Sequence, residues 1–312
     1  LEELITKPVA FERKSGTWVK EYITPPSNDV LRILSTSYLN DEAIVFYLGF
    51  LNPTTLYFLD TVKGTHRFWK KATDFFETNN LKYEMDFAIG SDGVKIPYQI
   101  VMPEKLDPKQ RYPVIIYVYG GHGVARTAWY SPSIGSEWLS KGGIYVVANT
   151  RGGGAYGEAW HQAAIRTTKY KTVDDVATVA KALIERKISM PKMIGVYGSS
   201  SGGTTSCSTL VRYPELVNAA VCESGFTDML RYNQLFKGSS WIPEYGDPDI
   251  PTERKYLLKY STYHLVEKNK YYPAPFFISY LNDDRVHPSH YRRMAVKMDK
   301  LGKDYYFYES PK

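Results

Sequence analysis

The sequence predicts a doubly wound α/β domain with a mostly parallel sheet, preceded by a short all-β segment. Two observations lead to this prediction. Up to about residue 75, short strand-like runs alternate with turn residues. From about residue 81, uninterrupted apolar runs alternate with helical patterns. Uninterrupted apolar runs are typical of parallel strands covered on both faces, and their alternation with helices is typical of a doubly wound sheet.

The N-terminal segment, residues 1–75, is predicted to be a partial β-propeller of about one blade. Its strand-like runs are Val30–Leu34, Ala43–Tyr47 and Leu56–Leu59. The turns between and after them are Asn40-Asp41, Asn52-Pro53 and Lys63-Gly64. A meander of three or four short strands cannot bury both faces alone, and propeller blades occur in sets. We therefore expect further sequence upstream, which agrees with a first residue that is not an initiator methionine.

Residues 76–312 are predicted to form the α/β domain. It should begin with a hairpin, Glu84 to Met102, that turns at Ser91-Asp92-Gly93. The later predicted strands are Val114–Val118, Ile144–Ala148, Met193–Tyr197, Ala219–Cys222, Phe276–Leu281 and Tyr305–Tyr308. Three helices are expected: one capped by Thr172 with Asp175 completing a capping box, one ending at Arg212, and one ending at Gly302.

Composition narrows the class of protein. The 312 residues are 43% hydrophobic and 23% charged, which is ordinary for a globular protein. The formal net charge is +6, but basic residues are scattered among acids, so no nucleic-acid partner is predicted. No apolar run approaches the roughly 20 residues of a membrane span. Cys207 and Cys222 fall in predicted buried elements rather than in a disulfide framework, which indicates a reducing, cytoplasmic compartment.

The most informative motif is Gly198-Ser199-Ser200-Ser201-Gly202-Gly203, which directly follows a predicted strand and opens a predicted helix. It fits G-x-S-x-G, the strained strand-to-helix turn that exposes a nucleophilic serine in the α/β-hydrolase fold. Glycines are needed because side chains beside the turn would collide with the strand and helix that meet there. Ser200 is the predicted nucleophile, since only this serine has glycine two residues away on both sides. The alternative is a glycine- and serine-rich loop without chemistry.

A catalytic triad in this fold has the chain order Ser, Asp, His. Asp283 and Asp284 follow the predicted strand Phe276–Leu281, and one of them is the predicted acid; the alternative is a solvated acidic turn. The histidine should follow the last strand. After the aspartates only His287 and His290 remain, and both lie at the start of the next helix, which is the wrong element.

Four segments together resemble the prolyl oligopeptidase family of serine peptidases. They are Tyr117-Val118-Tyr119-Gly120-Gly121, the stretch Asn149 to Gly157, the Ser200 turn, and Asp283-Asp284-Arg285-Val286. The similarity extends from about Val30 to Lys312. It implies hydrolysis of short peptides after proline, without a metal or cofactor, by a domain that a seven-bladed propeller normally gates.

The resemblance also implies roles for individual residues. Ser200 is implied as nucleophile and Asp283 as the acid that orients the histidine. The Tyr119 hydroxyl and the Ser201 backbone N–H are implied to form the oxyanion hole. Substrate contacts implied by the resemblance are Arg285 to a backbone carbonyl, Trp241 stacked on the proline ring, and pocket positions at Phe226, Tyr245 and Val286. The alternatives are a core or lid aromatic for Trp241 and an ion pair with Asp284 for Arg285.

Three departures from the family pattern affect these expectations. His122 stands where the family has phenylalanine, which implies a more polar pocket wall and a less strict preference for proline. Ser201 replaces the usual asparagine but keeps its backbone N–H. The family carries its histidine on a loop a few tens of residues past the aspartate, and Glu309 to Lys312 resembles the approach to that loop. The catalytic histidine is therefore expected beyond residue 312, and a protein of the given sequence is expected to have impaired or no peptidase activity.

Two other functions remain open from the sequence. One is a different serine hydrolase, acting on esters or after basic residues, for which Glu244 is the only acidic group near the predicted pocket. The other is an inactive relative that serves as a binding module and keeps the serine turn for folding.

Overall fold

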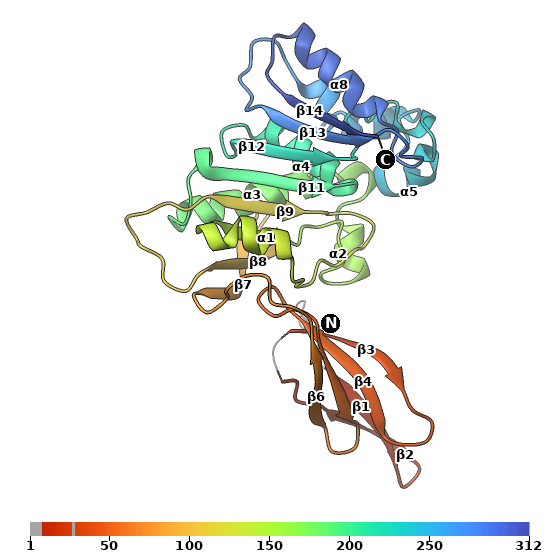
Figure 1. Ribbon diagram of the computed structural model, residues 1–312. Helices are drawn as coiled ribbons and strands as arrows, with labels where there is room; N and C mark the ends of the chain where they lie inside the picture. The colour runs from red at the N-terminus through yellow and green to blue at the C-terminus, as the bar shows by residue number, and fades with distance from the viewer. Residues whose placement is uncertain (1–7, 27–28, 312) are drawn as a thin grey trace. The chain divides into compact units, whose positions relative to one another are not determined.

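A computed structural model describes residues 8–26 and 29–311 (Figure 1). The chain divides into two compact units. The first comprises the residues up to Tyr83 together with Thr127–Lys141, and the second comprises Glu84–Arg126 and Gly142–Lys312. The order predicted from sequence, an all-β segment followed by an α/β domain, is confirmed. The assignment of residues 1–75 to a propeller and 76–312 to a peptidase domain stays a prediction.

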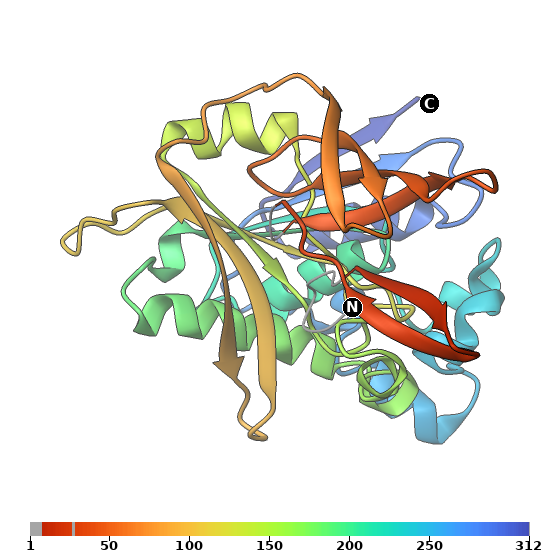
Figure 2. The ribbon, with the colours of Figure 1, turned by 90° about the horizontal axis from the view of Figure 1, so that it is seen from below.

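The first unit contains two antiparallel sheets. A hairpin of β1 (Val9–Lys14) and β2 (Thr17–Tyr22) forms one of them (Figure 2). The other is a four-stranded meander in the order β3-β4-β5-β6. Its strands are β3 (Val30–Thr36), β4 (Glu42–Leu48), β5 (Thr55–Asp60) and β6 (Thr65–Lys71). Val45, Tyr47 and Leu59 form the centre of a small core here, so the predicted meander is confirmed, whereas the hairpin was not predicted.

Residues 127–141 also belong to the first unit and carry α1 (Pro132–Glu137). The Ser131 hydroxyl caps this helix by accepting the Ile134 N–H at 3.3 Å. A Cβ at Gly135 would lie 1.9 Å from the Phe76 ring, so glycine permits close contact there. Phe76 in turn stacks on Tyr130, with ring centroids 4.9 Å apart. This aromatic contact holds the segment within the first unit.

The second unit is built on an eight-stranded sheet in the order β14-β13-β12-β11-β9-β10-β8-β7. From β14 to β10 neighbouring strands are parallel, and β8 pairs antiparallel with β10. The strands are β7 (Leu81–Ile89), β8 (Lys95–Pro103), β9 (Val114–Val118), β10 (Ile144–Ala148), β11 (Ile194–Ser199), β12 (Ala219–Glu223), β13 (Pro275–Tyr280) and β14 (Tyr306–Ser310). The crossover at β9–β11 is the doubly wound arrangement that the alternating pattern predicted.

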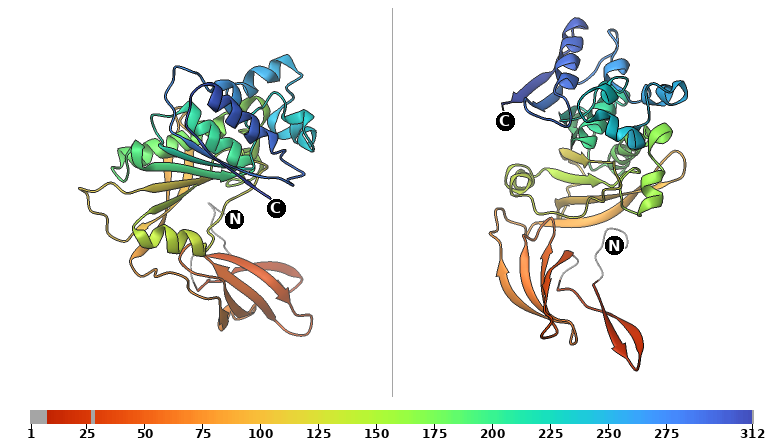
Figure 3. Two further views of the ribbon diagram at one scale, coloured as in Figure 1. Left: turned by 45° about the horizontal axis from the view of Figure 1, so that its top comes forward. Right: turned by 90° about the vertical axis from the view of Figure 1, so that its right-hand side faces the viewer.

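Three long helices cover one side of this sheet: α3 (Lys171–Glu185), α4 (Ser201–Arg212) and α8 (Ser289–Lys300) (Figure 3). Their apolar residues share one core with β8 to β13, centred on residues such as Ile116, Leu183 and Phe277. The short helices are α2 (Glu158–Gln162), α5 (Ile242–Tyr245), α6 (Pro251–Leu257) and α7 (Thr262–Leu265). Within the described residues, no helix has the length and apolar character that crossing a membrane would require.

The predicted cap of α3 is wrong. Thr172 and Asp175 both lie inside this helix, and the cap residue Tyr170 makes no side-chain capping bond. The Asp175 carboxylate is buried and receives the Arg151 guanidinium, with Nη2 to Oδ1 at 2.5 Å. Burial raises the pKa of Asp175 to about 6, against the opposing effect of Arg151. Asp175 therefore holds the Arg151 glycine-rich loop rather than the helix end.

The interpretation of the two cysteines is also wrong. Cys207 in α4 and Cys222 in β12 form a disulfide, with Cα atoms 5.6 Å apart. The packing of α4 directly on β12 brings them together, although both positions were correctly predicted to be buried. Cysteine content therefore gives no support for a reducing compartment.

Candidate active site

Ser200 lies at the turn between β11 and α4, at the carboxyl edge of the parallel strands. Its backbone has φ 58° and ψ −121°, a conformation that is strained for a residue with a side chain. The Ser200 N–H donates to the Glu223 carbonyl at 2.9 Å, and the Ser200 carbonyl accepts the Thr204 N–H at 3.2 Å. The turn is thus held from both sides while the serine side chain remains only half-buried.

The glycines of the motif allow very close backbone contacts. A Cβ at Gly198 would lie 2.3 Å from the Gly202 carbonyl oxygen. A Cβ at Gly202 would lie 2.2 Å from the Val118 carbonyl oxygen, and one at Gly203 would lie 2.2 Å from that of Glu223. The turn therefore sits directly against the ends of β9 and β12, which explains its glycine content.

Replacing Gly202 with alanine is expected to lower the free energy of unfolding by about 3 kcal/mol, because backbone cannot move aside as a side chain can. Urea denaturation of the variant measures this change. Gly195→Ala is the matched control, since its Cβ would meet nothing closer than 3.6 Å. Its stability should stay within about 1 kcal/mol of the parent protein. Equal stability of the two variants would contradict the close packing of the turn.

A pocket of about 140 Å³ opens beside Ser200. It collects eight residues that the sequence analysis singled out: Tyr119, His122, Ser200, Phe226, Trp241, Tyr245, Arg285 and Val286. They come from five places in the chain, namely the loops after β9, β12 and β13, the turn between β11 and α4, and the segment from Trp241 to the end of α5. The structure thus brings the predicted substrate-contacting residues together around the predicted nucleophile. Their roles stay predictions.

Aromatic rings form the wall of this pocket. Phe226 packs against Trp241 at 5.3 Å and meets Tyr245 edge-on at 5.6 Å between ring centroids. His122 meets the same Tyr245 edge-on at 5.9 Å. Burial lowers the pKa of His122, with Glu244 acting against this effect, so the imidazole is neutral near pH 7. The pocket is therefore a mostly apolar, uncharged hollow whose rim carries the exposed Arg285.

Asp283 and Asp284 have different surroundings. The Asp283 Oδ1 accepts the backbone N–H groups of Arg285 at 3.0 Å and Val286 at 2.9 Å. Asp284 is exposed, and its Oδ2 lies 3.6 Å from the Lys237 ammonium. Asp283 is fixed by its own loop, whereas the ion-pair partner of Asp284 is Lys237 and not the neighbouring Arg285.

Ser201 is the first residue of α4 and is buried. As the first helical residue, its backbone N–H has no acceptor within the helix. The N-terminal end of a helix also favours negative charge. This N–H follows directly after the Ser200 side chain in the chain, so the position suits an oxyanion donor.

The histidines of the chain contact groups other than Ser200 and Asp283. His290 is buried, and burial lowers its pKa to about 3. His287 stacks on Phe236, with ring centroids 4.3 Å apart. The remaining pairs are His66 with the Tyr47 hydroxyl, His264 with the Ser261 hydroxyl, and His161 with the Glu244 carboxylate. His122 is the one histidine that lines the pocket beside Ser200.

A buried charge cluster beneath the pocket was missed in the sequence. The Lys169 ammonium lies 2.5 Å from Glu244 Oε1, and both side chains are almost fully buried. His161 Nε2 lies 2.7 Å from Glu244 Oε2, and the His122 N–H donates to Oε1 at 3.0 Å. Burial alone would raise the pKa of Glu244, but Lys169, His161 and the His122 N–H lower it to about 2. Lys169 stands in a Thr-Thr-Lys-Tyr-Lys stretch that carries no recognisable motif.

Glu244 should make stability depend on pH. The folded protein binds the Glu244 proton more weakly than the unfolded chain, so the contribution is complete above about pH 4.5 and is lost as the pH falls towards 2. The difference in unfolding free energy between parent and Glu244→Gln is expected to shrink by about 3 kcal/mol over this range. Urea titrations at pH 2 to 6 measure it. A difference that does not vary with pH would contradict the lowered pKa.

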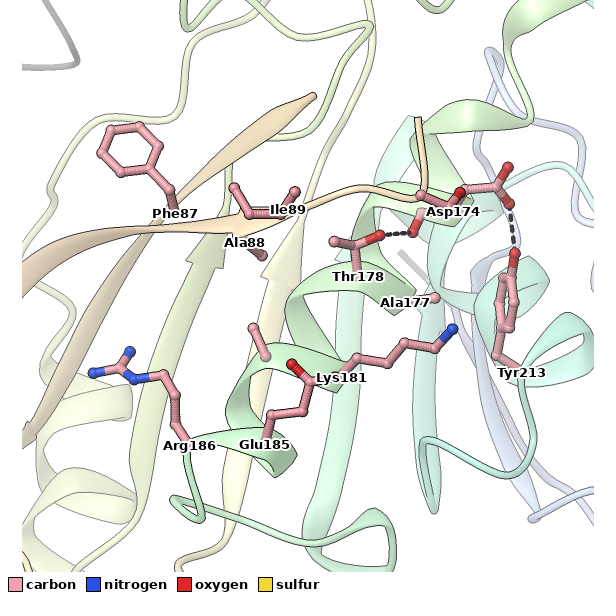
Figure 4. A pocket seen from close by; sticks show the side chains of 12 residues that line it. Phe87, Ala88, Ile89, Asp174, Ala177, Thr178, Lys181, Glu185, Arg186 and Tyr213 are labelled. Carbon is pink, nitrogen blue, oxygen red and sulfur yellow. Dashed lines mark hydrogen bonds between the residues drawn. The ribbon is translucent and has the colours of Figure 1, made fainter. Parts of the chain in front are cut away.

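A larger hollow of about 470 Å³ lies away from Ser200, between β7 and α3 (Figure 4). Asp174, one of two acidic residues that line it, accepts the Tyr213 hydroxyl at 2.7 Å and pairs with Arg212 at 2.7 Å. The Thr178 hydroxyl donates a hydrogen bond to the Asp174 backbone carbonyl. None of the residues predicted to be catalytic lines this hollow, so the Ser200 pocket is the candidate active site.

The sheet topology and the strained serine turn define a chain with the α/β-hydrolase fold. The profile of the prolyl oligopeptidase family, peptidase family S9, matches residues 130–312. An uncharacterized peptidase of Sinorhizobium fredii is 34% identical over 99% of this chain and 43% of its own length. A prolyl endopeptidase of Elizabethkingia meningoseptica is 31% identical over 78% of this chain and 35% of its own. The chain therefore belongs to the prolyl oligopeptidase family of serine peptidases.

The solved structures agree with this assignment. A post-proline cleaving enzyme from Rickettsia typhi superposes with a TM-score of 0.91 at 29% identity, covering 98% of this chain and 45% of that one. The chain thus spans less than half the length of the relatives it matches.

Proposed function

We propose that this chain is the main part of the catalytic domain of a peptidase that cleaves short peptides on the carboxyl side of proline. The observation that carries the proposal is that Ser200, Trp241 and Arg285 line the same small pocket. A flat indole face complements a pyrrolidine ring without demanding hydrogen bonds. The names of the relatives, prolyl endopeptidase and post-proline cleaving enzyme, support the same specificity.

In the proposed reaction the Ser200 Oγ attacks the carbonyl carbon after proline and passes its proton to a histidine. The Tyr119 hydroxyl and the Ser201 N–H stabilise the oxyanion that forms. The histidine then gives the proton to the leaving amine, the peptide C–N bond breaks, and water later releases the acyl group by the reverse proton path. Asp283 orients the histidine.

We propose that this histidine follows residue 312. The end of β14 supports this placement, because Ser310 and Pro311 lie beside the Asp283 loop: the Leu281 N–H donates to the Ser310 carbonyl at 2.8 Å, and the Asn282 side chain to that of Pro311 at 3.3 Å. The next residues of a longer chain would therefore start next to the acid. Residues 1–75 are proposed to be a blade of the family's propeller.

Cleavage after basic residues is less well supported. A cationic side chain requires a free carboxylate in its pocket, and Glu244 is already engaged by Lys169, His161 and a backbone N–H. The pocket wall itself is mainly aromatic, and Glu244 does not line it.

The test is a panel of chromogenic peptides with proline, alanine or arginine before the scissile bond, offered to the full-length protein. We expect kcat/KM to be highest for proline, with alanine detectable because the neutral His122 replaces a purely apolar wall. A preference for arginine, or hydrolysis of simple esters alone, would overturn the proposal in favour of the alternatives. Absence of any turnover would identify an inactive relative.

A further inference from the structure

We infer that Glu244, paired with Lys169, is a positioning residue that fixes the Tyr119–His122 loop against the Trp241–Tyr245 turn. The inference rests on the proposed function, in which the loop supplies an oxyanion donor and the turn supplies the proline pocket. Neither Glu244 nor Lys169 lines the pocket beside Ser200. They act through the residues that do.

The first step of the argument is that one carboxylate joins three segments. Glu244 belongs to α5, next to the pocket residue Tyr245. Its Oε1 accepts the His122 backbone N–H at 3.0 Å, which ties α5 to the loop after β9. Its Oε2 meets His161 Nε2 at 2.7 Å, which ties α5 to α2. The pocket wall, the oxyanion loop and α2 are therefore connected at one side chain.

Lys169 holds the same loop from a second point. Its ammonium donates to the Gly120 carbonyl at 2.8 Å and to Glu244 Oε1 at 2.5 Å. The loop is thus held by hydrogen bonds to the Gly120 carbonyl and from the His122 N–H, on both sides of Gly121. A Cβ at Gly121 would lie 2.3 Å from the Ser201 Oγ, so the gripped segment packs directly against the nucleophile turn.

The position of the Tyr119–His122 loop should depend on the charges of both Glu244 and Lys169. Both side chains are buried: that of Lys169 is 3% exposed and that of Glu244 is 6% exposed. Removing one charge of a buried pair leaves the other without compensation, which is strongly unfavourable, whereas removing both is often tolerated. The loop should therefore shift most when Glu244 alone is neutralised. It should shift less when Lys169 is neutralised as well, although the bond to the Gly120 carbonyl is then also lost.

The shift matters for catalysis because Tyr119 directly precedes Gly120. A misplacement of about 1 Å can lower a rate by about 100-fold. The same shift moves His122, which meets Tyr245 across the pocket at 5.9 Å between ring centroids. Both kcat and KM are therefore expected to respond, the first through Tyr119 and the second through the pocket.

The anchoring is tested by amide hydrogen exchange of the segment 119–124 in Glu244→Gln, a readout that needs no activity. The His122 N–H would then donate to a neutral amide oxygen beside the uncompensated charge of Lys169, and this weaker hold should speed exchange about 10-fold or more. The matched control is Glu253→Gln, because Glu253 is also buried, pairs with Arg166 and accepts the Asp247 N–H at 2.6 Å, and none of these three residues lines the pocket. Exchange in the segment should be unchanged in this control. Unchanged exchange in Glu244→Gln would overturn the inference.

The catalytic consequence is tested in the full-length protein with a proline peptide. Glu244→Gln should lower kcat/KM about 100-fold with changes in both constants, and the double variant Lys169→Met/Glu244→Gln should recover part of this loss. Glu253→Gln should keep both constants even if it unfolds more easily. Normal kinetics in Glu244→Gln would also overturn the inference. If exchange responds as expected but the unmodified full-length protein shows no activity after proline, the proposed function fails while the anchoring stands.

Discussion

The full-length protein with Ser200 replaced by alanine is expected to lose roughly 10⁶-fold in kcat towards a proline peptide, with KM little changed. The alanine removes the attacking oxygen but leaves the pocket and the oxyanion donors in place. Serine and alanine both carry a Cβ, so the strain of φ 58° is the same for both, and the fold should tolerate the change. Initial-rate assays with a chromogenic proline substrate measure the loss of kcat.

Ser199→Ala is the matched control, since it removes a hydroxyl one residue away at the end of β11. It should retain kcat within about 10-fold. A fluorophosphonate reagent provides a second readout, because it should label Ser200 in the parent protein and nothing in the Ser200→Ala variant. Labelling of Ser199, or similar rates from Ser200→Ala and the parent, would remove Ser200 as nucleophile.

The elements that were predicted well have a strong local pattern and a simple burial rule. β9 and β10 are apolar runs buried on the sheet, and α8 carries an apolar stripe facing β13. The β1–β2 hairpin was missed because nearly all of its residues are exposed, including Phe11 and Trp18. A hairpin with no buried face leaves no periodic signal to detect.

The errors have a common cause, which is a partner distant in sequence. Asp175 has the spacing of a capping-box acid, but Arg151, 24 residues earlier, takes its carboxylate. Cys207 and Cys222 look like separate buried thiols until α4 packs on β12. Local patterns give no information about which elements meet, so neither pairing was predictable from them.

The residues of the candidate site also fall into those predicted from local sequence and those that only the folded chain brings together. The Ser200 turn and the Asp283 loop are each contained in a few consecutive residues, and both were found from the sequence. Glu244 and Lys169 are 75 residues apart, and only the folded chain brings them together. The residue pattern alone could not separate Asp283 from Asp284, and only the family resemblance implied Asp283. The structure gives the two carboxylates distinct environments.

Asp283→Asn in the full-length protein is expected to lower kcat about 10⁴-fold, the effect of losing the acid that holds a triad histidine in its reactive tautomer. Asp284→Asn, which changes the same chemical group one residue away, should alter kcat by no more than about 3-fold, because Asp284 is exposed and faces Lys237. Steady-state kinetics of both variants with a proline peptide measure the contrast. A larger loss in Asp284→Asn would transfer the role to that residue.

Asparagine is the informative substitution because it separates chemistry from loop structure. The Asp283 Oδ1 accepts two backbone N–H groups, and an amide oxygen can accept both of them as well. Asp283→Asn should therefore keep the loop and its neighbours Arg285 and Val286 in place, so that KM changes little. Asp283→Ala removes these hydrogen bonds too, and should raise KM as the pocket rim moves. Similar KM values for the two variants would show that the loop does not depend on Asp283, and the carboxylate would then be held for catalysis alone.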